Sequence, residues 1–191
     1  MAKLILMRHL ESKWNKENRF TGWTDVSLSE EGIKNAEKVA EKLSNKNINV
    51  VYTSPLIRNR DSVSLVLEIL GKKDLPVIID KALNERNYGD LQGLNKDEVK
   101  EQYGEDQVQR WRRNWDQAPP KGESLKDVFN RVVPFYKEHI EKDLKSGKNV
   151  LVVASHNSLR ALVKYLENIS DKDIISLEIP TGTTREYEIG S

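Results

Sequence analysis

Short apolar runs alternate with longer segments of helical periodicity along this chain. The apolar runs cover residues 4–7, 49–52, 77–79 and 150–154, and each has the length and composition of a buried strand. The helical segments cover residues 57–70, 97–103, 107–115, 124–144 and 158–167, and another follows residues 27–30. Because strands that alternate with helices form parallel sheets, the pattern predicts an α/β fold with a mostly parallel central sheet. Residues 184–189 are expected to add an edge strand.

Local signals predict how several of these helices begin, bend or end. Residues 27–30 (SLSE) have the pattern of a capping box, with Ser27 and Glu30 as the interacting pair. The helix that follows is expected to bury one apolar stripe, formed by Ile33, Ala36, Val39, Ala40 and Leu43. Gly71 predicts the end of the helix over 57–70, and Pro134 predicts a bend in the helix over 124–144.

The composition narrows the class of protein. With 191 residues, of which 37% are hydrophobic and 32% charged, residues 1–191 are expected to form a single domain. The formal net charge of +1 gives no reason to expect a nucleic acid or membrane partner. The absence of cysteine excludes disulfides, thiolate metal sites and a cysteine nucleophile. No apolar run has the length of a signal peptide or a membrane span, so we expect a cytoplasmic protein.

Chemically reactive residues follow each predicted strand. The first strand is followed by Arg8 and His9, the second by Thr53, Ser54 and Arg58, the third by Glu85 and Arg86, and the fourth by Ser155, His156 and Asn157. Ligands of parallel α/β sheets bind beyond the carboxyl ends of the strands. We therefore expect these residues to meet at one rim of the sheet.

This set of side chains is typical of phosphoryl transfer. Arginine binds phosphate oxygens with a planar fork of donors and stays charged. A histidine among arginines is disfavoured as a cation, and a neutral imidazole is a nucleophile toward phosphorus. Glu85 could accept the proton of the attacking oxygen or donate a proton to the leaving oxygen. Since the sequence has neither a Walker lysine loop nor an acidic metal cluster, it predicts metal-free transfer through a phosphohistidine at His9. His139, inside a predicted helix, is expected to have no catalytic role.

Motifs over nearly the whole chain resemble those of the cofactor-dependent phosphoglycerate mutases of the histidine phosphatase superfamily. The matching motifs are RHLESKWN, NRFTGWTDVSLSEEG, YTSPLIR, LNERNYGDLQGLNKDE, WRRNWDQAPP, GESL, NSLRALVKYLE and IPTGT. The resemblance implies a three-layer α/β/α sandwich. It also implies interconversion of 3-phosphoglycerate and 2-phosphoglycerate in glycolysis and gluconeogenesis, with 2,3-bisphosphoglycerate as the primer and no metal.

The resemblance also implies a role for each matching residue. His9 becomes phosphorylated, Arg8 and Arg58 hold its phosphoryl group, and Glu85 is the proton donor and acceptor. The remaining matches bind the phosphates or the carboxylate of the substrate, and they are Asn15, Thr21, Gly22, Arg86, Tyr88, Lys96, Arg112, Arg113 and Asn157.

Two positions depart from the family pattern. Leu10 stands where the family has glycine after its Arg-His pair, and glycine reaches backbone angles that leucine resists. The family reads His-Gly-Asn-Ser where this chain has Ser155, His156, Asn157 and Ser158. Three interpretations are open: a β-bulge at residues 154–155 re-aims His156, His156 enters the pocket from the following loop, or Ser155 substitutes as a neutral donor. We favour His156 as the functional second histidine.

The chain is also shorter than many relatives between the WRR and ESL motifs. We therefore expect a more open pocket, which would favour hydrolysis of the phosphohistidine, and a monomer or homodimer. The main alternative function is a phosphatase of phosphoglycerates or other small phosphate esters that uses the same histidine. A non-catalytic phosphate-binding protein is a third hypothesis, which the combined presence of His9, Arg8, Arg58 and Glu85 disfavours.

Overall fold

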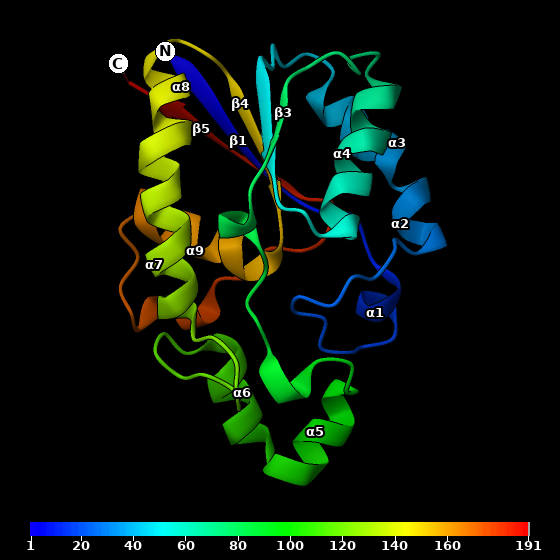
Figure 1. Cartoon of the computed structure of the whole chain (residues 1–191), viewed down its shortest axis with the longest axis vertical. Helices are drawn as coiled ribbons and strands as arrows, with labels where there is room; N and C mark the ends of the chain where they lie inside the picture. The colour runs from blue at the N-terminus through cyan, green and yellow to red at the C-terminus, as the bar shows by residue number, and fades with distance from the viewer. Residues whose placement is uncertain (191) are drawn as a thin grey trace.

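The computed structural model describes residues 1–190 and is built around a five-stranded sheet of order β3-β2-β4-β1-β5 (Figure 1). The parallel strands are β1 (Ala2–Arg8), β2 (Val50–Thr53), β3 (Val77–Ile79) and β4 (Val150–Ala154). The edge strand β5 (Thr184–Ile189) pairs antiparallel with β1. The predicted α/β class with a mostly parallel sheet is confirmed.

Helices cover both faces of the sheet, as the three-layer prediction requires (Figure 1). One face carries α2 (Glu30–Lys34), α3 (Ala36–Leu43) and α4 (Ile57–Ile69), and the other carries α7 (Leu125–Phe135), α8 (Glu141–Lys145) and α9 (His156–Leu166). The remaining helices α1 (Lys13–Lys16), α5 (Lys96–Tyr103) and α6 (Glu105–Arg113) lie beyond the carboxyl ends of the strands. They enclose the rim at which the predicted site residues meet.

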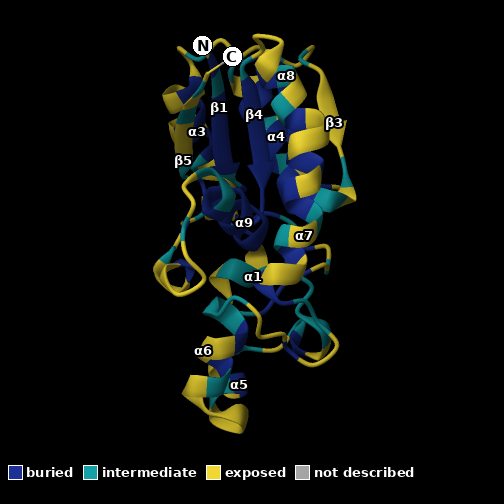
Figure 2. Cartoon of the chain, turned by 90° about the vertical axis from the view of Figure 1, so that its left-hand side faces the viewer, coloured by how far each residue is buried: buried dark blue, intermediate teal, exposed yellow. Residues whose placement is uncertain are grey.

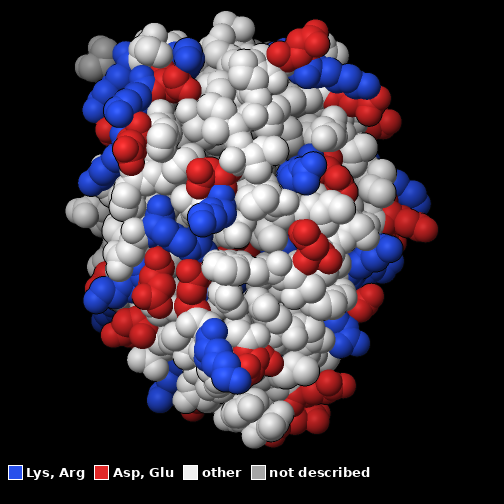
Figure 3. Space-filling view, viewed as in Figure 1, with Lys and Arg blue, Asp and Glu red and all other residues white. Residues whose placement is uncertain are grey.

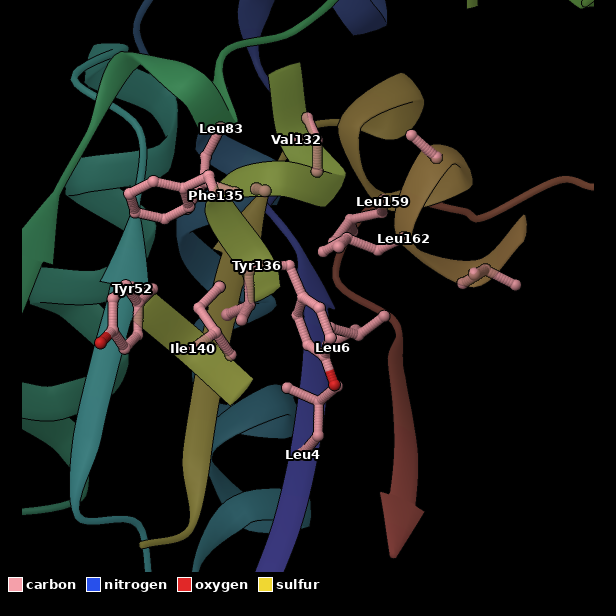
Figure 4. Packing of buried hydrophobic residues seen from close by; sticks show 14 of the residues in the cluster. Leu4, Leu6, Tyr52, Leu83, Val132, Phe135, Tyr136, Ile140, Leu159 and Leu162 are labelled. Carbon is pink, nitrogen blue, oxygen red and sulfur yellow. The ribbon is translucent and has the colours of Figure 1, made fainter. Parts of the chain in front are cut away.

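The central strands are buried on both faces because their side chains alternate between two cores. Leu4 and Leu6 of β1 pack on the side of α7, α8 and α9 (Figure 4), whereas Ile5 and Met7 pack against α3 and α4. Residues of β4 alternate in the same way, and none of them is more than 1% exposed. Figure 2 shows the result, with β1 and β4 buried and the outer helix surfaces exposed. This arrangement is the reason for the continuous apolar runs in the sequence.

The segment after residue 27 differs from the sequence prediction. The helix cap is Ser29, whose hydroxyl accepts the Gly32 N–H, and Ser27 does not cap it. The chain leaves one helix and enters the next at Asn35, so α2 and α3 are separate. Ile33 therefore leaves the apolar stripe and is 49% exposed, while the other four residues of the predicted stripe are buried.

Two further helix predictions need small corrections. Pro134 is followed by a π-helical turn over Tyr136–Ile140, which joins α7 to α8. Proline has no backbone N–H to donate to the carbonyl four residues earlier, so one regular α-helical hydrogen bond is lost at Pro134. The helix predicted over 107–115 instead begins at Glu105 and ends at Arg113, because Asn114 takes an extended conformation.

Acidic and basic side chains are interspersed on the face shown in Figure 3, without a large area of one sign. Such a surface matches the near-zero net charge. Among the helices of residues 1–190, none combines the length and apolar character needed to cross a bilayer.

We expect replacement of Leu6 by alanine to lower the free energy of unfolding by about 2–5 kcal/mol, because the side chain is only 2% exposed and lies inside the larger core. Ile33→Ala is the matched control, and the exposure of Ile33 predicts a change within about 0.5 kcal/mol. Urea denaturation of both variants measures the difference. Equal losses would contradict the described packing.

Candidate active site

One pocket opens at the carboxyl ends of the strands, beneath α5 and α6. It collects the predicted catalytic and substrate-binding residues apart from Ser155 and Arg86, and Thr53 and Ser54, which were expected at the same rim, do not line it. The predicted residues that line it are Arg8, His9, Asn15, Thr21, Gly22, Arg58, Glu85, Tyr88, Lys96, Arg112, Arg113, His156 and Asn157. Phe20 and Glu178 line it as well and were missed by the sequence analysis.

His9 is positioned by the end of β1. Its backbone N–H donates to the Ala154 carbonyl of β4, which continues the sheet pairing by one residue. Its Nδ1 lies 2.6 Å from the Leu10 carbonyl oxygen. A carbonyl only accepts, so Nδ1 carries the proton and Nε2 keeps a free lone pair.

The surroundings keep this imidazole neutral. His9 is 2% exposed, and burial is the main cause that holds its pKa well below the ordinary value. The charges of Arg58 and Arg8 lower the pKa further, while the hydrogen bond to Leu10 opposes the shift. A neutral ring with Nε2 unprotonated is the form that can attack an electrophile.

Arg8 and Arg58 are held beside His9 by backbone carbonyls. Arg8 Nη1 donates to the Ile179 oxygen at 2.6 Å, and Arg58 donates to the oxygens of Gly22 and Thr24 at 2.7 and 3.1 Å. Burial lowers the pKa of both guanidiniums, that of Arg58 to about 10, so both remain charged at neutral pH. Their charge is available to a bound anion.

The segment 20–22 forms the neighbouring wall. Gly22 has a φ of +56°, and a Cβ there would meet the end of the Gln92 side chain. Glycine suits this position for its backbone angle, and a larger residue would also have to displace Gln92. Asn15 sits in the first turn of α1, where its side-chain oxygen accepts from the N–H and hydroxyl of Ser12.

Glu85 lies across the pocket and is 7% exposed. Its Oε1 accepts from two backbone N–H groups, of Arg86 at 2.7 Å and of Asn157 at 3.0 Å. Its backbone carbonyl accepts from the Trp23 indole at 2.6 Å. These contacts hold Oε1, and no hydrogen bond to Oε2 is formed by the described residues.

Arg86 lies behind the pocket wall, although the sequence analysis placed it among substrate contacts. It is fully buried and donates to the Trp111 carbonyl and, at 3.2 Å, to the Asn157 side-chain oxygen. Asn157 in turn donates to the Tyr88 hydroxyl. Arg86 thus supports Asn157 and Tyr88, which do line the pocket.

A second group of cations lines the pocket in addition to Arg8 and Arg58. Lys96 begins α5, and Arg112 and Arg113 end α6. Burial, followed by the charges of Arg112, Arg8 and Arg113, lowers the pKa of Lys96 to about 8. Glu178 contacts Arg113 at 2.5 Å. The pocket therefore contains positive charge beyond that of Arg8 and Arg58, which suits a molecule with two anionic groups.

The structure separates the two candidates at the altered motif. Strand β4 ends at Ala154 in one-to-one register with β1, so no bulge is present there. Ser155 is the extended residue that precedes α9, is fully buried, and accepts from Asn59 Nδ2 at 3.2 Å. His156 occupies the first turn of α9 and lines the pocket.

The tautomer of His156 follows from its neighbours. The Ile179 N–H donates to Nε2 at 3.2 Å, so a neutral ring carries its proton on Nδ1. Burial, followed by the charges of Arg8 and Arg160, holds the pKa of His156 well below its ordinary value. The ring is therefore a neutral hydrogen-bond donor at neutral pH.

Leu10 is accommodated without backbone strain. It is not among the residues with positive φ, and its side chain is fully buried in the core beneath α3 and α4. Its N–H donates to Ser62 Oγ at 2.9 Å. The glycine of the family pattern is not needed here for its backbone angles.

Arg160 is a further buried arginine that the sequence analysis missed. It donates to the carbonyls of Leu177, Arg113 and Ile174 and to the Asn157 side chain. Nothing in its local sequence distinguishes it from an ordinary helix arginine, since most of its partners are backbone atoms.

Comparison with known proteins places the chain in a family. The model of the histidine phosphatase superfamily (branch 1) matches residues 4–191. A 2,3-bisphosphoglycerate-dependent phosphoglycerate mutase of Cytophaga hutchinsonii is 48% identical over 191 residues, covering 100% of this chain and 89% of that protein. An enzyme of the same name from Lachnoclostridium phytofermentans is 47% identical, covering 98% of this chain and 86% of that protein.

Solved structures share the fold at lower identity. Bacillus stearothermophilus YhfR has a TM-score of 0.86 and 26% identity, covering 100% of this chain and 92% of that chain. A mycobacterial glucosyl-3-phosphoglycerate phosphatase has a TM-score of 0.84 and 26% identity, covering 97% of this chain and 89% of that chain. With its high identity to two mutases over nearly its full length, the chain belongs to the 2,3-bisphosphoglycerate-dependent phosphoglycerate mutase family of the histidine phosphatase superfamily.

Proposed function

We propose that this protein interconverts 3-phosphoglycerate and 2-phosphoglycerate in glycolysis and gluconeogenesis, through a phosphohistidine at His9. The observation that carries the proposal is the buried, neutral imidazole of His9 near the charges of Arg8 and Arg58, in a pocket that Lys96, Arg112 and Arg113 also line. A substrate with a phosphate and a carboxylate matches these cations. The family to which the chain belongs supports the same activity.

In the first step, 2,3-bisphosphoglycerate primes the enzyme. His9 Nε2 attacks phosphorus, the N–P bond forms, and the P–O bond to the glycerate breaks. Arg8 and Arg58 stabilise the charge on the equatorial oxygens. Glu85 gives its proton to the leaving oxygen, which becomes the free hydroxyl of a monophosphoglycerate.

The second step returns the phosphoryl group. A glycerate hydroxyl attacks the phosphohistidine while Glu85 accepts its proton, so the bisphosphate is regenerated and His9 is again neutral. The other phosphate then passes to His9, which completes the isomerisation. Lys96, Arg112 and Arg113 hold the end of the substrate that does not react. Because arginine and lysine supply the charge that a metal would otherwise bring, the proposed reaction uses no metal.

His156 is proposed as the second histidine of this reaction. It lines the pocket, whereas Ser155 is buried beside Asn59. Its Nδ1–H would donate to an oxygen of the transferring phosphoryl group, since Nε2 is engaged by the Ile179 N–H.

A phosphatase is the second candidate, because it would need only the same nucleophile with water as acceptor. The likeness to a mycobacterial glucosyl-3-phosphoglycerate phosphatase favours this alternative. Lys96, Arg112 and Arg113 favour the mutase, since they would retain the monophosphoglycerate while the phosphoryl group is on His9.

The partner of the enzyme is a small molecule, and we propose a cytoplasmic monomer or homodimer. The edge strand β3 favours the homodimer, because Val77, Ile78 and Ile79 are 38–48% exposed along an unpaired edge. Glycolysis is cytoplasmic, which is the reason for the proposed location.

A coupled assay tests the main proposal. We expect conversion of 3-phosphoglycerate to 2-phosphoglycerate that is stimulated by 2,3-bisphosphoglycerate, with little release of phosphate in the same tube. His9→Ala should abolish both activity and the phosphoenzyme. Phosphate release without isomerisation would instead establish the phosphatase. The absence of both isomerisation and phosphate release would favour a binding protein.

Separate replacement of His156 and Ser155 by alanine tests the second histidine. We expect His156→Ala to lower kcat by at least about tenfold, since a positioned donor to the transferring group is lost. Ser155→Ala should change kcat by less than about threefold, because the hydroxyl lies outside the pocket. The reverse order would assign the role to Ser155.

The pH dependence of kcat/KM tests the role of Lys96. Its pKa of about 8 lies below the ordinary lysine value, so the side chain is charged below that pH and loses its charge above it. We therefore expect kcat/KM to fall as the pH rises past about 8. Lys96→Arg stays charged and should shift this loss to higher pH. An identical profile for both proteins would exclude Lys96 as the group responsible.

A further inference from the structure

Arg131, a residue of α7 outside the pocket, holds the backbone that carries Glu85. Its Nη1 donates to the carbonyl oxygens of Ala82 and Asn84 at 2.8 and 2.9 Å. Its Nη2 donates to the carbonyl oxygen of Glu85 itself at 2.9 Å. One guanidinium thus binds three carbonyls in the four residues that lead into the carboxylate.

Glu123 completes the arrangement from the start of α7. Its two oxygens accept from Arg131 Nε and Nη2, both at 2.9 Å, which is a bidentate ion pair. One of these oxygens also accepts the Asn87 N–H at 2.8 Å. The pair is partly shielded, with side chains 22% and 20% exposed. The ion pair therefore contacts the backbone on both sides of the peptide between residues 85 and 86: Arg131 binds carbonyls up to Glu85, and Glu123 binds the Asn87 N–H.

The peptide group between Glu85 and Arg86 connects this ion pair to the carboxylate. Its oxygen accepts from Arg131 and from the Trp23 indole, and its N–H donates to Glu85 Oε1. Because a peptide group is planar, the position of its oxygen determines where its N–H points. Donors at the oxygen also polarise the group and strengthen the bond that the N–H makes.

We propose that Arg131, with Glu123, is a positioning residue for proton transfer by Glu85. Arg131 fixes the plane of the 85–86 peptide, and that plane orients the carboxylate toward the leaving oxygen. The inference rests on the proposed function, because it needs Glu85 as the proton donor. Arg131 is absent from the residues that line the pocket, so its effect is indirect.

The dependence of the phosphorylation rate on the leaving group distinguishes this role from a purely structural one. When 2,3-bisphosphoglycerate phosphorylates His9, the N–P bond forms, the P–O bond breaks and the alkoxide must receive the proton of Glu85. When p-nitrophenyl phosphate does so, the phenolate leaves without a proton. A misplaced Glu85 slows only the first reaction, whereas a damaged pocket slows both.

The experiment measures the rate of His9 phosphorylation by both donors in Arg131→Lys, Arg131→Met and Glu123→Gln. We expect Arg131→Met to slow transfer from 2,3-bisphosphoglycerate by about 10- to 100-fold, as part of what a general acid contributes. The half-saturating donor concentration should change by less than about twofold, and transfer from p-nitrophenyl phosphate by less than about threefold. Arg131→Lys should recover part of the rate, and Glu123→Gln should show a smaller loss with the same selectivity.

Two controls make the outcome decisive. Glu85→Gln should show the same dependence on the leaving group, with a larger effect. Arg185→Lys removes the guanidinium of another ion pair, with Glu167 far from the pocket, and should leave both rates unchanged. Thermal melting identifies any variant that has lost its fold, and Arg131→Lys and Glu123→Gln are the milder changes for that case.

Equal slowing with both donors, or no slowing with either, in the Arg131 variants would overturn the positioning role. If Glu85→Gln still shows its dependence on the leaving group, the proposed function survives that result. If Glu85→Gln shows no such dependence, the proton-donor assignment fails and the inference fails with it.

Discussion

The buried arginines of this protein are held mainly by backbone carbonyl oxygens. Arg8 and Arg58 donate to carbonyls of the loops around the pocket, and Arg160 binds carbonyls of four separate residues. A carbonyl satisfies a guanidinium donor without cancelling its charge, whereas a carboxylate would neutralise it. The pocket therefore keeps the positive charge that an anionic substrate requires, and the loops that supply the carbonyls are fixed by the same contacts.

Burial, followed by the charge of these arginines, determines the protonation of both histidines. His9 and His156 are buried among these arginines, so the cationic form of each ring is disfavoured. Each ring then needs one defined tautomer, and a backbone group selects it: the Leu10 carbonyl for His9 and the Ile179 N–H for His156. Ile179 also accepts from Arg8, so a single residue of the C-terminal segment aligns a guanidinium and an imidazole.

The alternation of strands and helices, and the meeting of polar residues at one rim, could be predicted from the sequence. Both follow from hydrophobic periodicity and from the common direction of parallel strands. The burial of Arg86 behind Asn157 and the contacts of Arg131 could not be predicted, because most of their partners are backbone atoms that leave no mark in the sequence. Ile33 was misplaced because α2 ends and α3 begins at Asn35, so that Ile33 and the other four residues of the predicted stripe belong to different helices.

The altered motif after β4 shows why a shift by one residue is tolerated here. Within a strand, such a shift would turn the side chain to the opposite face. Strand β4 ends at Ala154, however, and His156 lies in the first turn of α9. The alternation of side chains between the two faces of a strand therefore does not apply to His156. The N-terminus of a helix also disfavours a cationic ring. The position therefore suits a neutral donor, and the positive charge near the ring belongs to the arginines.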